Sequence, residues 1–448
     1  MGPWSLPPDL VALLTAWAAC LNSSRLAPRW SVLWAGVFFA GGRRTASSWF
    51  RAAGVGRQFR LYYYLLGTIG RKAHLLACGL LRLVLRRLHT GEHWLFALDD
   101  TPTQRYGPCV EGAGIHHNPT PGPAGEKFVY GHVWVTLACV LGHPWWGPIA
   151  LPLLARLYIR QKDLSKLPPW YRWTFRTKLE LAADLIAWLV EWLRPGETPV
   201  WLAADGFYAK RPVLKAARDH GVVLFSRLRK DAALWSLPQA VPAGQKGPGR
   251  PRIYGTQSYS LAKRAGHAQG WQTAEVQQYG GRVAKTFKTF VATWHPAGGV
   301  IRVVLVREPE QPDGWVAYFC TDVDQSAETI LEVMAQRGTI EQTFKDVKEV
   351  WGAGQQQLRN VWANVGAFHV CLWAYTLAEW WAWDRSHAQL VNRRASPWDD
   401  PDRRPSPQDR RRALRRQGIE QGISQASGSG GLSRQMRRLV RGLLGLLA

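Results

Sequence analysis

Two short apolar segments, each followed directly by aspartate, constrain the fold of this chain more than any other feature. Residues 94–98 run into Asp99 and Asp100, and residues 200–204 run into Asp205. Apolar runs of this length that stop at a polar residue are typical of buried strands. A helical pattern and a further apolar run, 222–225, follow the second aspartate. This order of strand, acid, helix and strand predicts an α/β domain with a mixed sheet.

The rest of the chain divides by its patterning. Apolar runs at 128–141 and 149–157 predict a pair of strands joined by a turn, and 178–193 predicts a helix that ends before Pro195 and Gly196. We expect five regions: a helical region over 1–90, an α/β core in two parts over 91–229 and 316–383, an antiparallel β insertion over 230–315, and a basic, partly disordered tail over 384–448.

The N-terminal region contains a short helix flanked by arginines. Thr45 is a suitable N-cap and Gly54 a suitable end for this helix. The flanking basic residues fit a helix-turn-helix that contacts DNA, namely Arg43, Arg44, Arg57 and Arg60. The alternative is an ordinary helical bundle with a solvated basic face.

The charge balance indicates a polyanionic partner. The 448 residues include 57 Lys and Arg against 32 Asp and Glu, a formal net charge of +25. An excess of this size is typical of proteins that bind nucleic acid. A genome rich in G and C, which favours arginine codons, is the other explanation.

Cysteine usage and hydropathy predict a cytoplasmic protein without a membrane span. The 6 cysteines form no CxxC pair and no zinc-ligand spacing. The uncharged segment 133–155 is interrupted by Gly and Pro, and 361–378 has the polar residues and length of a buried core helix. Residues 10–21 lack the preceding positive charge of a signal peptide.

A third acid, Glu341, lies in a predicted helix between two cations. Arg337, Glu341 and Lys348 share one helix face at 3.6 residues per turn. Three carboxylates meeting without Cys or His would form an all-oxygen site of the kind that holds Mg²⁺ or Mn²⁺. Two such ions can support phosphodiester cleavage, and the flanking cations would hold the phosphates.

The residues together resemble the DDE transposases of bacterial insertion sequences, in the cut-and-paste branch with a β-strand insertion before the glutamate. The resemblance rests on Asp-Asp-Thr-Pro at 99–102, on Ala-Asp-Gly at 204–206, and on Arg337, Glu341 and Lys348 with their spacing. It covers roughly residues 43 to 383. It departs from the family pattern at Met334, where a tyrosine is common.

The resemblance implies an RNase H-like fold with Asp99, Asp205 and Glu341 as catalytic residues that bind two Mg²⁺ or Mn²⁺ ions. The family motif Asp-x-Thr selects Asp99, while Asp100 remains the alternative first acid; the two would point to opposite faces of a continuing strand. Glu341 could instead form an ordinary ion pair with Arg337 or Lys345. A rival acidic stripe on one helix consists of Glu180, Asp184 and Glu191.

Further DNA contacts are expected outside the three acids. Lys345 would join Arg337 and Lys348 at the phosphates, and Arg250 and Arg252 lie in a small basic loop of the kind that enters a minor groove. In the resembled branch an insertion-domain tryptophan stacks on a flipped base. Trp294, at the end of a predicted strand, is the best candidate here, with core packing as its alternative.

The sequence therefore leads to one main hypothesis about function. We expect a transposase that binds the terminal inverted repeats of its element as a homodimer on double-stranded DNA, cleaves the ends with divalent metal, and joins them to target DNA in the bacterial cytoplasm, at the nucleoid. A catalytically inactive DNA-binding descendant and an RNase H-like nuclease without strand transfer are the rivals.

Overall fold

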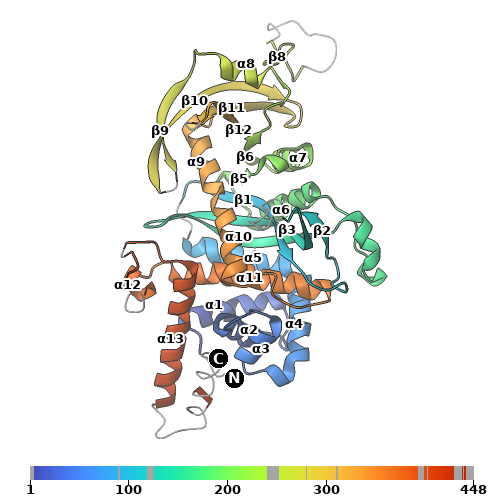
Figure 1. The fold of residues 1–448 in the computed structure, drawn as a ribbon, viewed down its shortest axis with the longest axis vertical. Helices are drawn as coiled ribbons and strands as arrows, with labels where there is room; N and C mark the ends of the chain where they lie inside the picture. The colour runs from blue at the N-terminus through green and yellow to red at the C-terminus, as the bar shows by residue number, and fades with distance from the viewer. Residues whose placement is uncertain are drawn as a thin grey trace.

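The structure of the chain is a computed structural model. It describes residues 5–88, 91–118, 126–239, 252–278, 280–308, 311–391, 398–400, 402–427, 436 and 438–439. The molecule is elongated (Figure 1). Most of the helices lie at one end, the strands that carry and neighbour Asp99 and Asp205 lie in the middle, and the β insertion lies at the other end.

The N-terminal region is helical, as predicted. Its helices are α1 (Pro8–Ala18), α2 (Ala27–Phe39), α3 (Ala46–Ala52), α4 (Phe59–Arg71) and α5 (Ala73–Leu88). Thr45 caps α3 by accepting a hydrogen bond from the Ser48 amide at 3.1 Å, and Gly54 has a φ of +72°. Both features match the prediction for this helix. Trp49 and Phe50 of α3 are buried, so only part of its surface is free for a groove of DNA.

A mixed sheet occupies the centre of the molecule. Its central strands are β1 (Trp94–Gln104), β3 (Phe128–His143), β4 (Gly147–Tyr158), β5 (Val200–Ala204) and β6 (Val222–Leu228). They lie in the order β4-β3-β1-β5-β6, in which β1, β5 and β6 are parallel while β3 is antiparallel to both β1 and β4. The short strand β2 (Gly114–His117) also pairs with β3. The α/β class and the mixed sheet are thus as predicted.

Helices cover both faces of this sheet. On one face lie α9 (Ala327–Arg337) and α10 (Thr339–Glu349), whose Ile330 and Ile340 form a small core with Leu95 and Ala97 of β1. Phe96 and Leu98, which alternate with those residues, belong to the main core together with residues of α6 (Lys178–Leu193) and α7 (Arg211–Asp219). This alternation is what a strand buried on both faces requires.

The segment predicted as an antiparallel β insertion is antiparallel, and its strands continue the same sheet. It contains β7 (Leu234–Trp235), β8 (Ser258–Tyr259), β9 (Gln272–Gln278), β10 (Gly281–Trp294) and β11 (Gly299–Glu308), with the short helix α8 (Leu261–Gly266). The following strand, β12 (Gln311–Cys320), pairs with β11 on one side and β6 on the other. The described residues therefore form one 12-stranded sheet.

The long helix α11 (Val361–Ala382) is the predicted buried core helix. It is long and apolar enough to cross a membrane, but its most apolar window is 94% buried inside the protein. It crosses α4 at a close contact, because a Cβ at Gly366 would clash with the Leu66 carbonyl oxygen.

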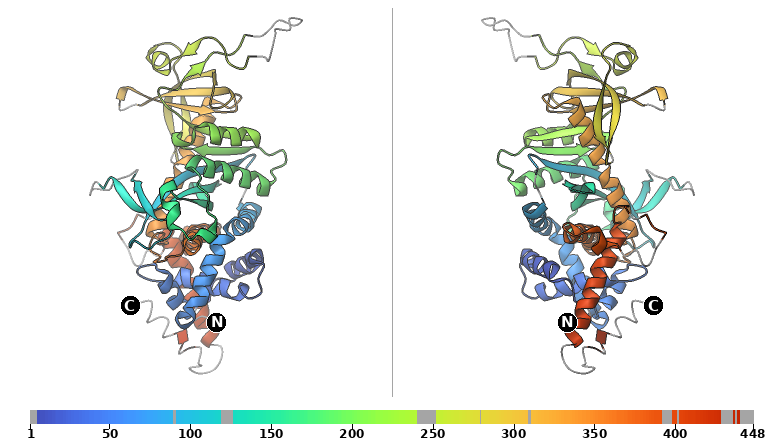
Figure 2. Two further views of the ribbon diagram at one scale, coloured as in Figure 1. Left: turned by 90° about the vertical axis from the view of Figure 1, so that its right-hand side faces the viewer. Right: turned by 90° about the vertical axis from the view of Figure 1, so that its left-hand side faces the viewer.

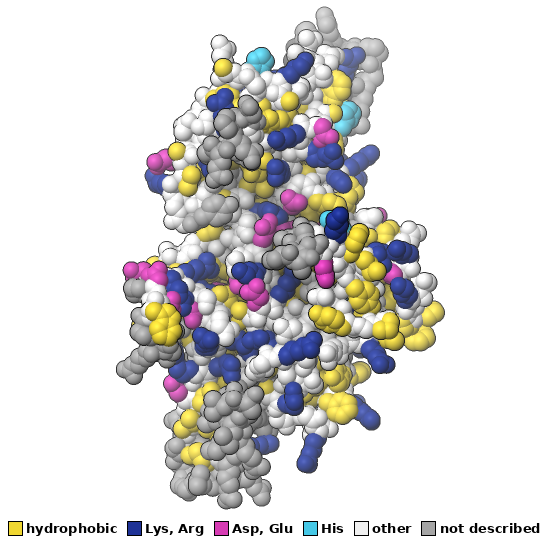
Figure 3. Space-filling model, viewed as in Figure 1, with side chains coloured by type: hydrophobic (Ala, Val, Ile, Leu, Met, Phe, Trp, Pro, Cys, Tyr) yellow, Lys and Arg dark blue, Asp and Glu magenta, His cyan; other side chains and the backbone are white. Residues whose placement is uncertain are grey.

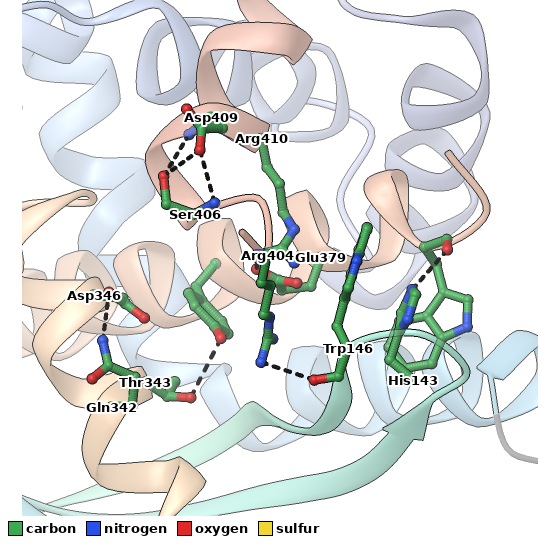
Figure 4. A network of polar contacts seen from close by, with 12 residues as sticks. His143, Trp146, Gln342, Thr343, Asp346, Glu379, Arg404, Ser406, Asp409 and Arg410 are labelled. Atoms are coloured by element: carbon green, nitrogen blue, oxygen red, sulfur yellow. Dashed lines mark hydrogen bonds and ion pairs between the residues drawn. The ribbon is translucent and has the colours of Figure 1, made fainter. Parts of the chain in front are cut away.

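The basic C-terminal segment is more ordered than predicted. After the short α12 (His387–Leu390), residues Pro407–Ser427 form helix α13. Glu379 of α11 and Arg410 of α13 form an ion pair of 3.0 Å with side chains 2% and 1% exposed (Figure 4). The side views show α13 at the same end of the molecule as the N-terminal helices (Figure 2). Of the predicted tail, residues 392–397, 401, 428–435, 437 and 440–448 lie outside the described residues.

Candidate active site

Asp99 and Asp205 are next to one another because of the register of two parallel strands. The last paired residues of β1 and β5 are Leu98 and Ala204, so the two aspartates are the next residues on neighbouring strands. Parallel strands are about 4.8 Å apart, which brings the two backbones close at this point. β5 ends here, while β1 continues to Gln104 beside β3. The prediction that Asp99 follows the end of its strand is wrong, whereas Asp205 does follow the end of β5.

Asp99 is held by one cation and one amide. Its Oδ2 accepts from Arg337 Nη2 at 2.5 Å and its Oδ1 from the Asp100 amide at 2.8 Å. Burial raises the pKa of the Asp99 carboxyl to about 6, and the neighbouring Asp100 and Asp205 add to the rise, although Arg337 and the amide act against it. A buried carboxylate with acidic neighbours is a group that gains from a nearby cation.

Arg337 joins this aspartate to Glu341. Its Nη1 donates to Glu341 Oε1 at 2.7 Å, and its side chain is 13% exposed, between 16% for Asp99 and 61% for Glu341. The predicted i, i+4 ion pair of Glu341 therefore exists. It is part of a three-residue bridge that ends at Asp99, which an isolated surface pair would not form.

Gly338 divides the predicted single helix into α9, which ends at Arg337, and α10, whose first turn carries Glu341. Arg337 and Glu341 still point to one another across the break. Lys348 lies two turns further along α10, where burial lowers the pKa of its ammonium group, and Lys345 is exposed. No hydrogen bond or ion pair joins either lysine to the three acids among the described residues.

Asp100 points to the opposite face of β1, as the alternation of a strand predicts. Its Oδ2 accepts from Lys178 Nζ at 2.6 Å and its Oδ1 from the Tyr208 hydroxyl at 2.8 Å. Asp100 thus has two partners of its own and shares neither with Glu341. Sequence reasoning missed Lys178 and Tyr208; the position of Tyr208 three residues after Asp205 was the available signal.

The acids are not arranged as a finished metal site. Across the part of the chain that the structure describes, no group of three or more Asp, Glu, His or Cys residues could hold a metal ion as it stands. The guanidinium of Arg337 lies between two of the carboxylates. Its positive charge lowers the pKa of Asp99, but burial outweighs this effect and the pKa remains raised.

Trp294 and Arg252 form no hydrogen bond or ion pair with the three acids within the described part of the chain. Trp294 is 7% exposed and packs edge-on against Phe319 at 5.1 Å, so in this conformation it is a core residue that cannot stack on a base. Its predicted alternative, core packing, is what the structure has. Arg252 is exposed, and Arg250 lies outside the described residues.

The rival acidic stripe on α6 has structural partners. Glu180 forms a capping box with Thr177 at the start of the helix, and Asp184 pairs with Arg176. These contacts account for two of its three acids without a metal.

Comparison with known proteins identifies the domain in which this site lies. Residues 178–377 match the family model of the transposase DDE domain. The match includes Asp205, Arg337 and Glu341, while Asp99 precedes it. A search of curated proteins found no match. Residues 178–377 are thus similar to the DDE domain of transposases.

Proposed function

We propose that the protein is an active DNA transposase, which cleaves the ends of a mobile element and joins them to target DNA. The observation that carries the proposal is the bridge from Asp99 through Arg337 to Glu341, beside Asp205. Arg337, Glu341 and Asp205 lie within the residues that match the transposase DDE domain. The order and direction of β4-β3-β1-β5-β6 support an RNase H-like core around it.

The residues fit a divalent cation by the chemistry of their donors. Asp99, Asp205 and Glu341 offer only carboxylate oxygens, and Mg²⁺ and Mn²⁺ prefer such ligands. The raised pKa of Asp99, about 6, marks a carboxyl group that lacks sufficient positive charge nearby. Two bound ions would activate the attacking oxygen and stabilise the leaving oxygen of a phosphodiester.

Arg337 has a defined role in this proposal. Its Nε is buried without a partner, while its two terminal nitrogens hold Asp99 and Glu341. A guanidinium binds phosphate in the same two-pronged way as it binds carboxylates. When DNA and metal enter, Arg337 would move from the carboxylates to a phosphate next to the cleaved bond, and Lys345 and Lys348 would hold phosphates further along the strand.

Asp100, Lys178 and Tyr208 keep β1 in place on the other face. Their hydrogen bonds, 2.6 and 2.8 Å long, tie the strand to α6 and to the turn that follows Asp205. They fix the separation of the two strand positions that carry the catalytic aspartates. We therefore assign Asp99, and not Asp100, as the first metal ligand.

The surface charge supports double-stranded DNA as the partner. Lys and Arg side chains are spread over the face seen in Figure 3, and acidic side chains occur at few places on it. A net charge of +25 favours binding to phosphates. A homodimer is expected because two ends must be joined in one event, and the bacterial nucleoid is the expected location.

A cleavage assay tests the proposal. Purified full-length protein is incubated with labelled DNA that carries the inverted repeats bracketing its gene, with Mg²⁺, Mn²⁺ or EDTA. We expect nicking at the repeat boundary only with metal, and transfer of a pre-cut 3′-hydroxyl end into plasmid DNA. Asp205→Asn and Glu341→Gln should abolish both reactions.

Asp219→Asn is the matched control, because Asp219 lies on α7 and pairs only with the neighbouring Lys215 and Arg218. It should cleave like the wild type. Binding of the repeats without metal-dependent nicking would contradict the proposal in favour of an inactive DNA-binding protein. Nicking without joining would favour a nuclease.

A further inference from the structure

A cavity of about 340 Å³ lies beside the edge strand β4, away from the three acids. Its walls come from α4 and α5, from residues 155–157 of β4, from Ile159, residues 171–174 and Arg176 of the segment that follows β4, from α6, and from the start of α11. This volume is within the range of about 300–1,000 Å³ that small-ligand sites occupy. The chain between β4 and α6 lies at the right of the sheet in Figure 1.

The cavity is strongly cationic. Arg71, Arg156, Arg172 and Arg176 line it, against a single carboxylate, Asp184. Asp184 pairs with Arg176, whereas the side chains of Arg71 and Arg172 have no carboxylate partner among the described residues. The Nε of Arg156 is buried without a hydrogen-bond partner. Unpaired guanidinium groups around one cavity are suited to an anionic ligand.

Aromatic rings share the cavity with the arginines. Trp173 and Trp362 line it with centroids 5.0 Å apart, and Tyr171 is fixed by a hydrogen bond of 2.5 Å from Asn360. Flat rings next to cations are what a base and its phosphate require of a binding site.

The backbone at Arg172 adds a further observation. Arg172 has a φ of +49° and a ψ of +39°, in the left-handed region that non-glycine residues rarely adopt. Arg172 takes this conformation as the residue that ends the short 3-10 helix Pro169–Tyr171, and it lines the cavity.

The cavity is close to the catalytic strand. Asp100 pairs with Val135 of β3, and Val135 pairs with Arg156 of β4, so the three residues form one row across the sheet. Directly opposed residues point to the same face, and two strand spacings amount to about 10 Å. Lys178, at the end of the segment that lines the cavity, bonds to Asp100 at 2.6 Å.

We propose that this cavity, on the opposite face of the sheet from Asp99 and Arg337, binds one unpaired nucleotide of the bound DNA. Its phosphate would contact Arg71, Arg156 and Arg172, and its base would lie against Trp173. A paired base cannot enter a concave cavity of this size, so the ligand must be unpaired. The inference rests on the proposed function only in taking DNA as the polymer.

Binding measurements with the full-length protein test this. Fluorescence anisotropy is recorded in EDTA with labelled oligothymidylate and with a labelled duplex. Arg172→Gly removes the guanidinium and leaves a residue that adopts a positive φ without strain. Trp173→Leu removes the ring. Lys162→Ala is the control, because Lys162 is exposed on the same segment but does not line the cavity.

For oligothymidylate we expect Arg172→Gly to weaken binding about fivefold or more and to lower the slope of log affinity against log salt by about 0.7. Trp173→Leu should weaken binding about five- to 150-fold without changing that slope. Both variants should bind the duplex with an affinity within about twofold of the wild type, which corresponds to about 0.4 kcal/mol. Lys162→Ala should bind both probes within the same limit.

The inference would be overturned if Arg172→Gly and Trp173→Leu lost affinity equally for oligothymidylate and for the duplex. It would also be overturned if both variants bound oligothymidylate as tightly as Lys162→Ala. Melting temperatures of the variants show whether a loss reflects unfolding, and Arg172→Gly should melt no lower than the wild type. The cleavage assay separates the two proposals. If the wild type cleaves DNA but the cavity variants bind like the wild type, this inference alone is defeated. If the cavity variants lose binding but the wild type cleaves no DNA, only the proposed function is defeated.

Discussion

At the scale of single residues, the unusual feature is a buried carboxyl group with acidic neighbours. The pKa of Asp99 is about 6 in the folded chain, above its ordinary value of 3.8. Between those two pH values the folded chain holds a proton that the unfolded chain has released. Stability conferred by the protonated carboxyl is therefore lost as pH rises through this window.

Asp99→Asn should remove this loss, since an amide does not ionise. We compare the melting temperatures of Asp99→Asn and the wild type in EDTA at pH 4.5 and pH 7.5. The melting temperature of the variant, relative to that of the wild type, should be higher at pH 7.5 than at pH 4.5. The corresponding change in unfolding free energy is roughly 1–3 kcal/mol. Other titrating groups cancel in the comparison.

Differential scanning fluorimetry at the two pH values provides the measurement, and Mn²⁺ adds a second readout. The ion should raise the melting temperature of the wild type at pH 7.5 and leave that of Asp99→Asn unchanged. A difference between variant and wild type that is constant with pH would show that the Asp99 carboxyl is not perturbed.

Much of the site at this scale was predictable. Asp205 and Glu341 follow from a strand end and from the spacing to Arg337 and Lys348. The bridging position of Arg337 between Asp99 and Glu341 was not predictable, because it depends on how α9 packs against β1. The sequence left Trp294 open between base stacking and core packing, because a tryptophan at the end of a strand has the same local pattern whether it packs inward or faces DNA.

At the scale of elements, helix α11 can be fully buried only because it approaches α4 closely. A Cβ at Gly366 would meet the Leu66 carbonyl oxygen, and one at Gly70 would meet the carbonyl oxygen of Trp362. Both glycines lie within helices, where glycine costs about 1 kcal/mol relative to alanine. That cost is outweighed by the contact of the two helices.

Gly366→Ala should destabilise the protein, although alanine is the better helix former. We expect a loss of about 1–3 kcal/mol, because the two helices must separate or shift to admit the methyl group. Chemical denaturation followed by circular dichroism gives the value. Gly41→Ala is the control, since a Cβ there has no neighbour within 4 Å. Equal stability of Gly366→Ala and Gly41→Ala would show that the helix crossing tolerates extra volume.

The elements themselves were largely predictable from periodicity. α6 has the predicted bounds, and β3, β4 and β5 lie where apolar runs indicated strands. The break at Gly338 was missed, because a single glycine in a helical pattern does not by itself predict a boundary. The pairing of β12 with both β6 and β11 was beyond sequence reasoning, since register between distant strands leaves no local signal.

At the scale of the whole molecule, a buried ion pair fastens the C-terminal segment to the body. Glu379 and Arg410 are almost fully buried, and Arg404 of the same segment bonds to the Trp146 carbonyl oxygen at 3.2 Å (Figure 4). Burial raises the pKa of Glu379, while Arg410 opposes the rise. A composition rich in arginine predicted a basic, partly disordered tail. Two of the arginines in this segment, Arg410 and Arg411, are instead buried in the protein interior.

Glu379→Gln should loosen this segment, because it leaves the Arg410 charge buried without a counter-ion. Loss of one partner of a buried pair costs about 3–5 kcal/mol. We expect a lower melting temperature and faster proteolysis within residues 402–427. Asp384, just after α11, forms an exposed ion pair with Arg87; the side chain of Asp384 is 68% exposed and that of Arg87 is 31% exposed. Asp384→Asn removes this pair and should lower the free energy of unfolding by at most about 1 kcal/mol. Equal effects of the two variants would mean that the buried pair does not hold the segment.

The central claim is that Asp99, Asp205 and Glu341 share one metal site when DNA is bound. Fe²⁺ can replace Mg²⁺ at oxygen sites and, with ascorbate and peroxide, cleaves a polypeptide next to the bound ion. With DNA of the element ends present, the account predicts chain breaks close to residues 99, 205 and 341 in the wild type, their loss in Asp205→Asn, and their retention in Asp219→Asn. Breaks that omit residue 341, or that persist in Asp205→Asn, would contradict it.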